Sequence, residues 1–222
     1  MANHPRVETT LAGPLPHIVV LGIGNVLWAD EGFGVRAVER LNAQGPWPAH
    51  VELLDGGTQG LALLPFVEAA NRLIVFDAVD FGLAPGALEV REGDAVPACL
   101  NARRMSLHQA GFSDVLACAQ LKGHYPDEIV LIGVQPVELD DFGGSLRPAV
   151  LAQIEPAVAK AREWLQRWGV APMNGAAIEP LNDASLTLAR YEGERPSAEM
   201  ANRHGDTRFW RPSLVVVPLE QP

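Results

Sequence analysis

The feature that most constrains the fold of this chain is an alternation of short apolar runs with longer segments of helical periodicity. The runs have the length of buried strands and occupy residues 17–21, 50–54, 72–76 and 128–134, with an edge-strand pattern at 87–91. Helices are expected at 31–41, at 61–70 with an early bend at Pro65, from Ser106 onward and at 148–168. Strands that alternate with helices form parallel sheets covered on both faces. The sequence therefore predicts an α/β fold, a three-layer α/β/α sandwich around a mostly parallel, twisted sheet of about five strands.

One domain with an appendage is the expected organisation. Residues 17–169 carry the alternating pattern, and the last and longest helix is expected to end at Gly169. Residues 170–222 have little periodicity, so we expect them to form an irregular C-terminal extension. Within it, the apolar run at 214–219 predicts a docking strand or a buried plug, and Pro218 favours an edge position.

Charge and apolar content exclude several classes of function. The chain has 222 residues, 27 acidic and 17 basic, and its formal charge of −10 repels nucleic acid and anionic lipid. No apolar run approaches the roughly 18 residues of a membrane span, and the first residues lack the apolar stretch of a signal peptide. The two cysteines, Cys99 and Cys118, lack CxxC spacing, so we expect them to be reduced and partly buried. We predict a cytoplasmic protein without membrane insertion, and a monomer, because nothing in the sequence requires a dimer.

Acidic residues follow three of the expected strands. Asp30 and Glu31 follow the first, Asp55 the second and Asp77 the third. The carboxyl ends of parallel strands meet at one edge of the sheet, where ligands bind in such folds. Because close carboxylates repel one another, a bound cation is an attractive partner for them.

His108 adds a nitrogen ligand to this set. Ser106 and Gln109 have the spacing of a capping box, which puts His108 in the first turn of a helix, where the helix dipole favours a neutral imidazole. Carboxylate oxygens and an imidazole suit Ni²⁺ or Zn²⁺ with open water positions. Structural explanations remain open for each residue: Glu31 as favourable charge at a helix start, Asp77 in an Asx turn, and His108 as an ordinary capped histidine.

The glycines after the first strand allow a competing interpretation. Gly22-Ile23-Gly24 precedes a helix, as in dinucleotide-binding folds, but Leu27 stands where the third glycine belongs. Asp30 and Glu31 would also put negative charge where a pyrophosphate meets the helix. No serine or cysteine nucleophile motif is present in the sequence.

Five segments in order, GIGNVLWADEGFGVRAVERL, VELLDGGTQGLALL, LIVFDAVDFGLAPG, SLHQAGFSDVLA and LIGVQPVEL, resemble the maturation endopeptidases of nickel-iron hydrogenases. The resemblance spans residues 17–169 and implies removal of a C-terminal peptide from the large-subunit precursor after nickel insertion. It implies that Glu31, Asp77 and His108 bind the precursor's nickel. The tail resembles that of the subgroup that serves uptake, membrane-bound hydrogenases.

The same resemblance suggests further roles. An aspartyl-type hydrolysis would use Asp30 or Asp77 as general base. The glycine-rich stretch Asp55, Gly56, Gly57 and Thr58 would receive the extended substrate tail through backbone hydrogen bonds, although Thr58 could instead simply cap the next helix. A non-catalytic chaperone that senses the metallated precursor is the alternative, and a nucleotide-binding oxidoreductase is a third.

Overall fold

A twisted five-stranded sheet forms the centre of the computed structural model, which describes residues 14–102, 107–175 and 178–194, without side chains at 101–102 and 107–110. The strand order is β2-β1-β3-β5-β4. Four strands are parallel: β1 (Ile18–Ile23), β2 (Val51–Gly57), β3 (Arg72–Ala78) and β5 (Glu128–Val134). The edge strand β4 (Leu88–Glu92) pairs antiparallel to β5. The predicted strands and the mostly parallel sheet are therefore confirmed.

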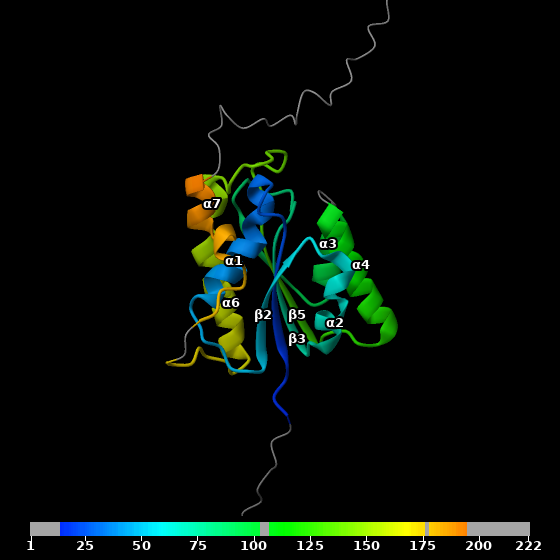
Figure 1. The fold of residues 1–222 in the computed structure, drawn as a ribbon. Helices are drawn as coiled ribbons and strands as arrows, with labels where there is room; N and C mark the ends of the chain where they lie inside the picture. The colour runs from blue at the N-terminus through cyan, green and yellow to red at the C-terminus, as the bar shows by residue number, and fades with distance from the viewer. Residues whose placement is uncertain (1–13, 103–106, 176–177, 195–222) are drawn as a thin grey trace, which may run out of the picture.

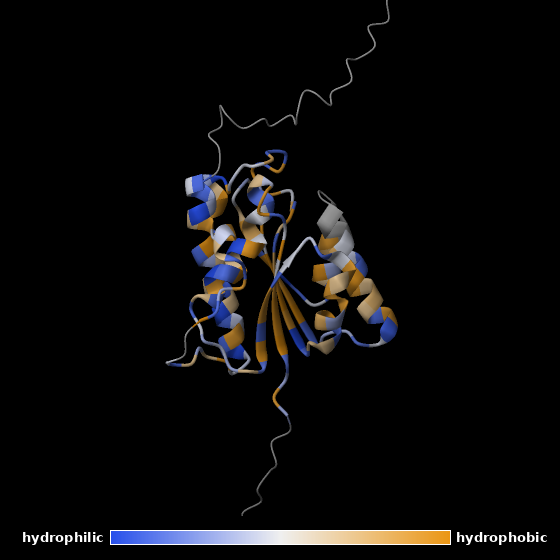
Figure 2. Cartoon of the chain, viewed as in Figure 1, coloured by the Kyte–Doolittle hydropathy of each residue, from blue (hydrophilic) through white to orange (hydrophobic). Residues whose placement is uncertain are grey.

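Helices cover both faces of the sheet (Figure 1). One face carries α1 (Phe33–Asn42), α5 (Pro148–Leu151), α6 (Ile154–Arg167) and α7 (Leu188–Glu194), and the other carries α2 (Leu64–Ala69), α3 (Ala95–Ala102) and α4 (Leu107–Lys122). Each face has its own buried apolar cluster, and the strands that separate them are apolar on both sides (Figure 2). In β1, Ile18 and Val20 belong to the α1 side, whereas Val19 and Leu21 belong to the α4 side.

Close contact between α1 and the sheet explains the glycines of the first turn. A Cβ on Gly34 of α1 would lie 2.2 Å from the carbonyl oxygen of Ile23 and 2.3 Å from that of Phe76. A Cβ on Gly22 would lie 2.4 Å from the carbonyl oxygen of Gly34. These glycines therefore let helix and strands approach each other, which is a packing role and not a phosphate-binding one.

Several helices differ from their predicted limits. The helix expected at 148–168 is two helices, α5 and α6, because Pro156 has no N–H to donate to the carbonyl of Ala152. As a result α4, with 16 residues, is longer than α6, with 14. Pro65 lies in the first turn of α2 and does not bend a helix, since the preceding residues form the 3₁₀ turn η2 (Gly60–Leu63). Helix α3 was not predicted.

The first part of the C-terminal extension has more order than predicted. It contains the 3₁₀ turn η3 (Ala184–Leu186) as well as α7, which lies beside α1 and α6 (Figure 1). Asp183 caps η3, since its Oδ1 accepts the backbone N–H of Ser185 at 2.8 Å, and this hydrogen bond lowers the pKa of Asp183. The apolar run at 214–219 lies outside the described residues.

Candidate functional site

The candidate site lies at the carboxyl edge of the sheet, where the predicted acidic residues meet. Gly22 of β1 is in register with Asp55 of β2 on one side and with Phe76 of β3 on the other. Asp77 follows directly in β3, opposite Gly133 of β5. The parallel register therefore brings Asp55 and Asp77 to the same edge, as predicted from the order of strands and acids.

Asp77 and Asp55 nevertheless point to opposite faces of the sheet. In β3, Leu73 and Val75 lie in the cluster beneath α2, α3 and α4, so the alternation of side chains directs Asp77 to that face. In β2, Val51 and Leu53 lie in the cluster beneath α1 and α6, which directs Asp55 to the other. The expectation that all the carboxylates crowd together therefore holds for the edge but not for the face.

Asp77 is buried, with an exposed fraction of 1%, at the end of β3. The same face carries α4, and His108 is the second residue of that helix, as the sequence predicted. The side chain of His108 lies outside the described ones. Among the side chains that are described, no three His, Cys, Asp or Glu gather as metal ligands.

The turn before α1 directs Asp30 and Glu31 differently. It is the 3₁₀ turn η1 (Ala29–Gly32), entered through Ala29 in the left-handed region at φ 41°, and it packs against β3. Asp30 is fully buried, whereas Glu31 is half-buried. A Cβ on Gly24, which has φ 134°, would lie 1.8 Å from the carbonyl oxygen of Glu31, so this loop closes tightly on the turn.

Both carboxylate oxygens of Asp30 bind backbone N–H groups of the loop after β5. Oδ2 accepts from Val137 at 2.8 Å and from Glu138 at 2.9 Å, and Oδ1 accepts from Arg147 at 2.6 Å. The backbone N–H of Asp30 donates in return to the carbonyl of Glu138 at 3.1 Å. Asp30 thus joins two loops of the carboxyl edge through charge-assisted hydrogen bonds.

Asp55, from the glycine-rich stretch, contacts residues that the sequence analysis did not single out. Its Oδ2 accepts from Nδ2 of Asn182 at 2.6 Å, and the same nitrogen donates to Oε1 of Glu39 at 2.9 Å. Burial raises the pKa of Asp55, against the lowering effects of the hydrogen bonds from Asn182 and Gly57 and of the charge of Arg36, while the charge of Glu39 adds to the rise. No local signal marks these partners, because Asn182 is distant in sequence.

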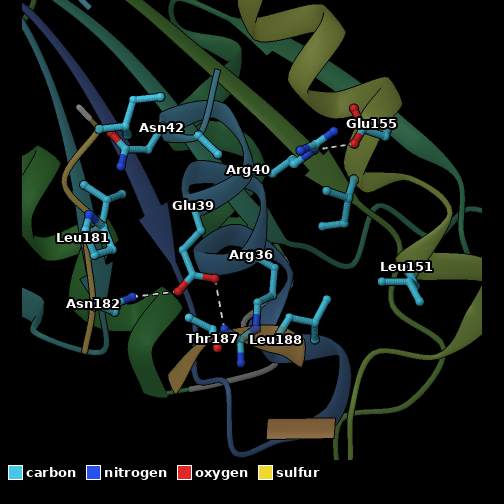
Figure 3. Close-up of a pocket in the computed structure, with 14 residues that line it drawn as sticks. Arg36, Glu39, Arg40, Asn42, Leu151, Glu155, Leu181, Asn182, Thr187 and Leu188 are labelled. Atoms are coloured by element: carbon cyan, nitrogen blue, oxygen red, sulfur yellow. Dashed lines mark hydrogen bonds and ion pairs between the residues drawn. The ribbon is translucent and has the colours of Figure 1, made fainter. Parts of the chain in front are cut away.

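A pocket of about 600 Å³ lies next to this group, between α1, the start of α6 and the extension (Figure 3). Its walls are apolar, with Leu151, Leu181 and Leu188 among them. The ion pair of Arg40 with Glu155 lies in the same pocket. The pocket is on the α1 face, so it is separate from the predicted ligand Asp77.

The cysteines are free and half-buried, as predicted. Burial raises the pKa of the Cys99 thiol, which disfavours the reactive thiolate.

Comparison with known proteins decides the family. The model of the hydrogenase maturation protease family matches residues 35–164, more than half of the chain. The chain belongs to this family. The protease is 58% identical over 201 residues to the hydrogenase expression/formation protein HupM of Azotobacter chroococcum mcd 1, a match that covers 90% of this chain and 96% of the relative.

Shorter relatives match the same α/β core. The hydrogenase 2 maturation protease of Escherichia coli K12 is 41% identical over 162 residues, which cover 72% of this chain and 98% of the relative. The solved structure of the hydrogenase maturating endopeptidase HybD from E. coli has a TM-score of 0.66 at 40% identity, with 69% of this chain and 94% of that chain covered.

These matches confirm the predicted family, the α/β fold and a peptide-bond hydrolase, and they support C-terminal processing of the hydrogenase large subunit. The protease family replaces the nucleotide-binding oxidoreductase that the first glycines had left open. Within the described part of the protease, no helix has the length and apolar character required to cross a bilayer.

Proposed function

We propose that this protease removes a C-terminal peptide from the nickel-loaded large-subunit precursor of a nickel-iron hydrogenase, and that it recognises the nickel carried by that substrate. Glu31, Asp77 and His108 would occupy open positions on the nickel. One observation carries this proposal: the buried Asp77 ends β3 against the turn that holds Glu31, on the sheet face that α4 covers with His108 in its first turn.

The chemistry of the residues assigns different roles to the two candidate bases. Both oxygens of Asp30 accept backbone hydrogen bonds in a fully buried position, which supports a positioning role for this carboxylate. Asp77 is the better aspartyl-type base. It would accept a proton from the attacking water while the scissile C–N bond breaks, and then return the proton to the leaving amine.

An exposed apolar surface beside the site supports a polypeptide substrate. We call it the apolar rim: Leu27, Trp28, Val137 and Phe142. Phe142 is 49% exposed, and its ring centroid lies 5.3 Å from that of Trp28. The carbonyl of Trp28 accepts the N–H of Glu31 at 2.9 Å, so the rim is continuous with the proposed nickel ligands. Apolar segments of the precursor would dock here.

The remaining features of the proposal concern the protease in the cell. It would act as a monomer in the cytoplasm, without nucleic acid or membrane insertion, and the strongly acidic composition agrees with the absence of nucleic acid partners. Its partner would be the precursor of an uptake, membrane-bound hydrogenase.

Mass spectrometry of a purified large-subunit precursor tests the function directly. The precursor is incubated with a substoichiometric amount of protease, with and without prior nickel loading. Loss of one defined C-terminal peptide only from the nickel-loaded precursor is the expected result. An intact precursor in a stable complex would support the chaperone alternative, and equal cleavage of both samples would refute nickel recognition.

A further inference from the structure

Asn182 connects the C-terminal extension to the glycine-rich stretch at the end of β2. Its single Nδ2 group donates to Asp55 at 2.6 Å and to Glu39 at 2.9 Å. Glu39 pairs in turn with the buried Arg36 at 2.9 Å (Figure 3). We call this set, Asn182, Asp55, Glu39 and Arg36, the Asn182 clasp.

The amide of Asn182 separates two carboxylates that would otherwise face each other. Asp55 Oδ1 is buried and has no hydrogen-bond partner among the described residues, so the carboxylate relies on Oδ2 and Asn182 for its side-chain hydrogen bond. A buried carboxylate that loses its donor either takes up a proton or moves toward water. Removal of the amide would therefore change both the charge and the position of Asp55.

The extension is fixed on both sides of Asn182, which gives the clasp a defined geometry. On one side, Nδ2 of Asn42 donates to the carbonyl of Glu179 at 2.8 Å. On the other, Arg36 donates to the carbonyl of Leu186, and its guanidinium lies 5.9 Å from the ring centroid of Tyr191. Asn182 thus reaches Asp55 from a segment that is anchored to α1.

Backbone contacts connect Asp55 with the proposed catalytic face. Two residues after Asp55, the carbonyl of Gly57 accepts the N–H of Gly24 at 3.0 Å. Gly24 in turn packs against the carbonyl of Glu31, with no room for a Cβ between them. A displacement at Asp55 would therefore be transmitted through two short contacts to a proposed nickel ligand.

The extension that carries the clasp is not a part of every relative. Asn182 lies outside the family-model match at 35–164. The E. coli hydrogenase 2 protease is matched over 98% of its length but covers only 72% of this chain, whereas the 58% identical relative covers 90%. The clasp is thus an addition to the family core and not a component of it.

We propose that Asn182 is a positioning residue: through Asp55 it sets the glycine-rich stretch 55–58 in the conformation that receives the extended tail of the large-subunit precursor. The extension thereby acts on substrate recognition from outside the catalytic face. This inference rests on the proposed function, because it concerns the binding of the same substrate.

The test compares Asn182→Ala with Asn42→Ala in the full chain. Asn42 is a matched control, because it has the same donor group and also fastens the extension to α1, but its hydrogen bond goes to Glu179 and not to Asp55. Cleavage rates are measured over a range of nickel-loaded precursor concentrations. In parallel, the pKa of Asp55 is followed by carboxyl-carbon NMR in both variants.

For Asn182→Ala we expect KM for the precursor to rise about tenfold, with kcat within about twofold of the original value, because a hydrogen bond to a carboxylate is lost away from the reacting bond. The pKa of Asp55 should rise further in this variant. Asn42→Ala should change neither quantity. Equal effects of the two variants, or an unchanged KM in Asn182→Ala, would overturn the proposal.

The NMR measurement separates this inference from the proposed function. If the original protein cleaves no precursor, the proposed function fails while the pKa of Asp55 still reports on the clasp. An Asp55 pKa that is the same in Asn182→Ala and in the original protein would overturn the clasp, whatever the outcome with the precursor.

Discussion

The backbone N–H of Arg147 donates to Oδ1 of Asp30 over 2.6 Å, although 117 positions separate the two residues in the chain. Together with the N–H groups of Val137 and Glu138 on Oδ2, this contact makes one buried carboxylate the junction between the turn of Glu31 and the loop after β5. The apolar rim depends on the same junction, because Trp28 and Phe142 belong to these two segments and form an isolated antiparallel bridge.

Asp30→Ala should lower the free energy of unfolding by about 3 kcal/mol or more, because it leaves buried backbone N–H groups without an acceptor. Urea denaturation measures the change. Asp140→Ala, at an exposed position of the same loop, should cost less than about 0.5 kcal/mol. Equal stability of the two variants would remove Asp30 from its role as a junction.

Asp77→Asn should abolish cleavage of the nickel-loaded precursor while the fold persists. The amide has nearly the same shape, but it has neither the charge that binds nickel nor the basicity to accept a proton. Mass spectrometry of the precursor measures cleavage, and circular dichroism verifies the fold. Normal processing by this variant would exclude Asp77 as a catalytic residue.

Phe142→Ser should raise KM for the whole precursor by about tenfold, with little change in kcat, because the lost contact serves docking rather than bond cleavage. Leu121→Ser is the control, since Leu121 is 88% exposed near the end of α4, away from the carboxyl edge. If both substitutions have the same effect on KM, the apolar rim is not a docking surface.

Gly34→Ala should be one of the most destabilising single substitutions, with a cost above about 3 kcal/mol, since its Cβ would meet two strand carbonyls within 2.3 Å. Gly193→Ala in α7 meets nothing within 4 Å and should gain up to about 1 kcal/mol from helix propensity. Thermal and urea unfolding compare the two. A Gly34→Ala protein as stable as the original would contradict the packing of α1 on the sheet.

Asp55 should make stability depend on pH. Its pKa is raised above 3.8, so the native state holds this proton more tightly than the unfolded chain does. Its contribution to stability is therefore fully present below 3.8 and is lost as pH rises through the folded-state pKa. Asp55→Asn should accordingly improve stability more at about pH 7 than at about pH 3.

Asp183 provides the comparison of opposite sign. The hydrogen bonds from Ser185 lower its pKa below 3.8, so its contribution is present above that pH and is lost as pH falls. Asp183→Asn should therefore lose stability at about pH 7 relative to about pH 3. Denaturation midpoints at the two pH values measure both variants, and parallel behaviour would contradict the assigned pKa directions.

Much of the fold could be predicted because it is encoded locally. The apolar runs of β1, β3 and β5 are buried on both faces and lie close to their expected limits. Helix limits were less predictable, as the division at Pro156 and the 3₁₀ turn before Phe33 show, because each depends on a single backbone hydrogen bond.

Sequence by itself determined the alternation of strands and helices, the acidic residues at the strand ends and the motifs of the family. The tertiary structure alone decided which face each acid occupies: the register and the alternation of side chains put Asp77 toward α4 and Asp55 toward α1. It also brought Asn182 to Asp55, across 127 positions. Such contacts leave no local pattern, because they arise only when packed layers bring distant segments of the chain together.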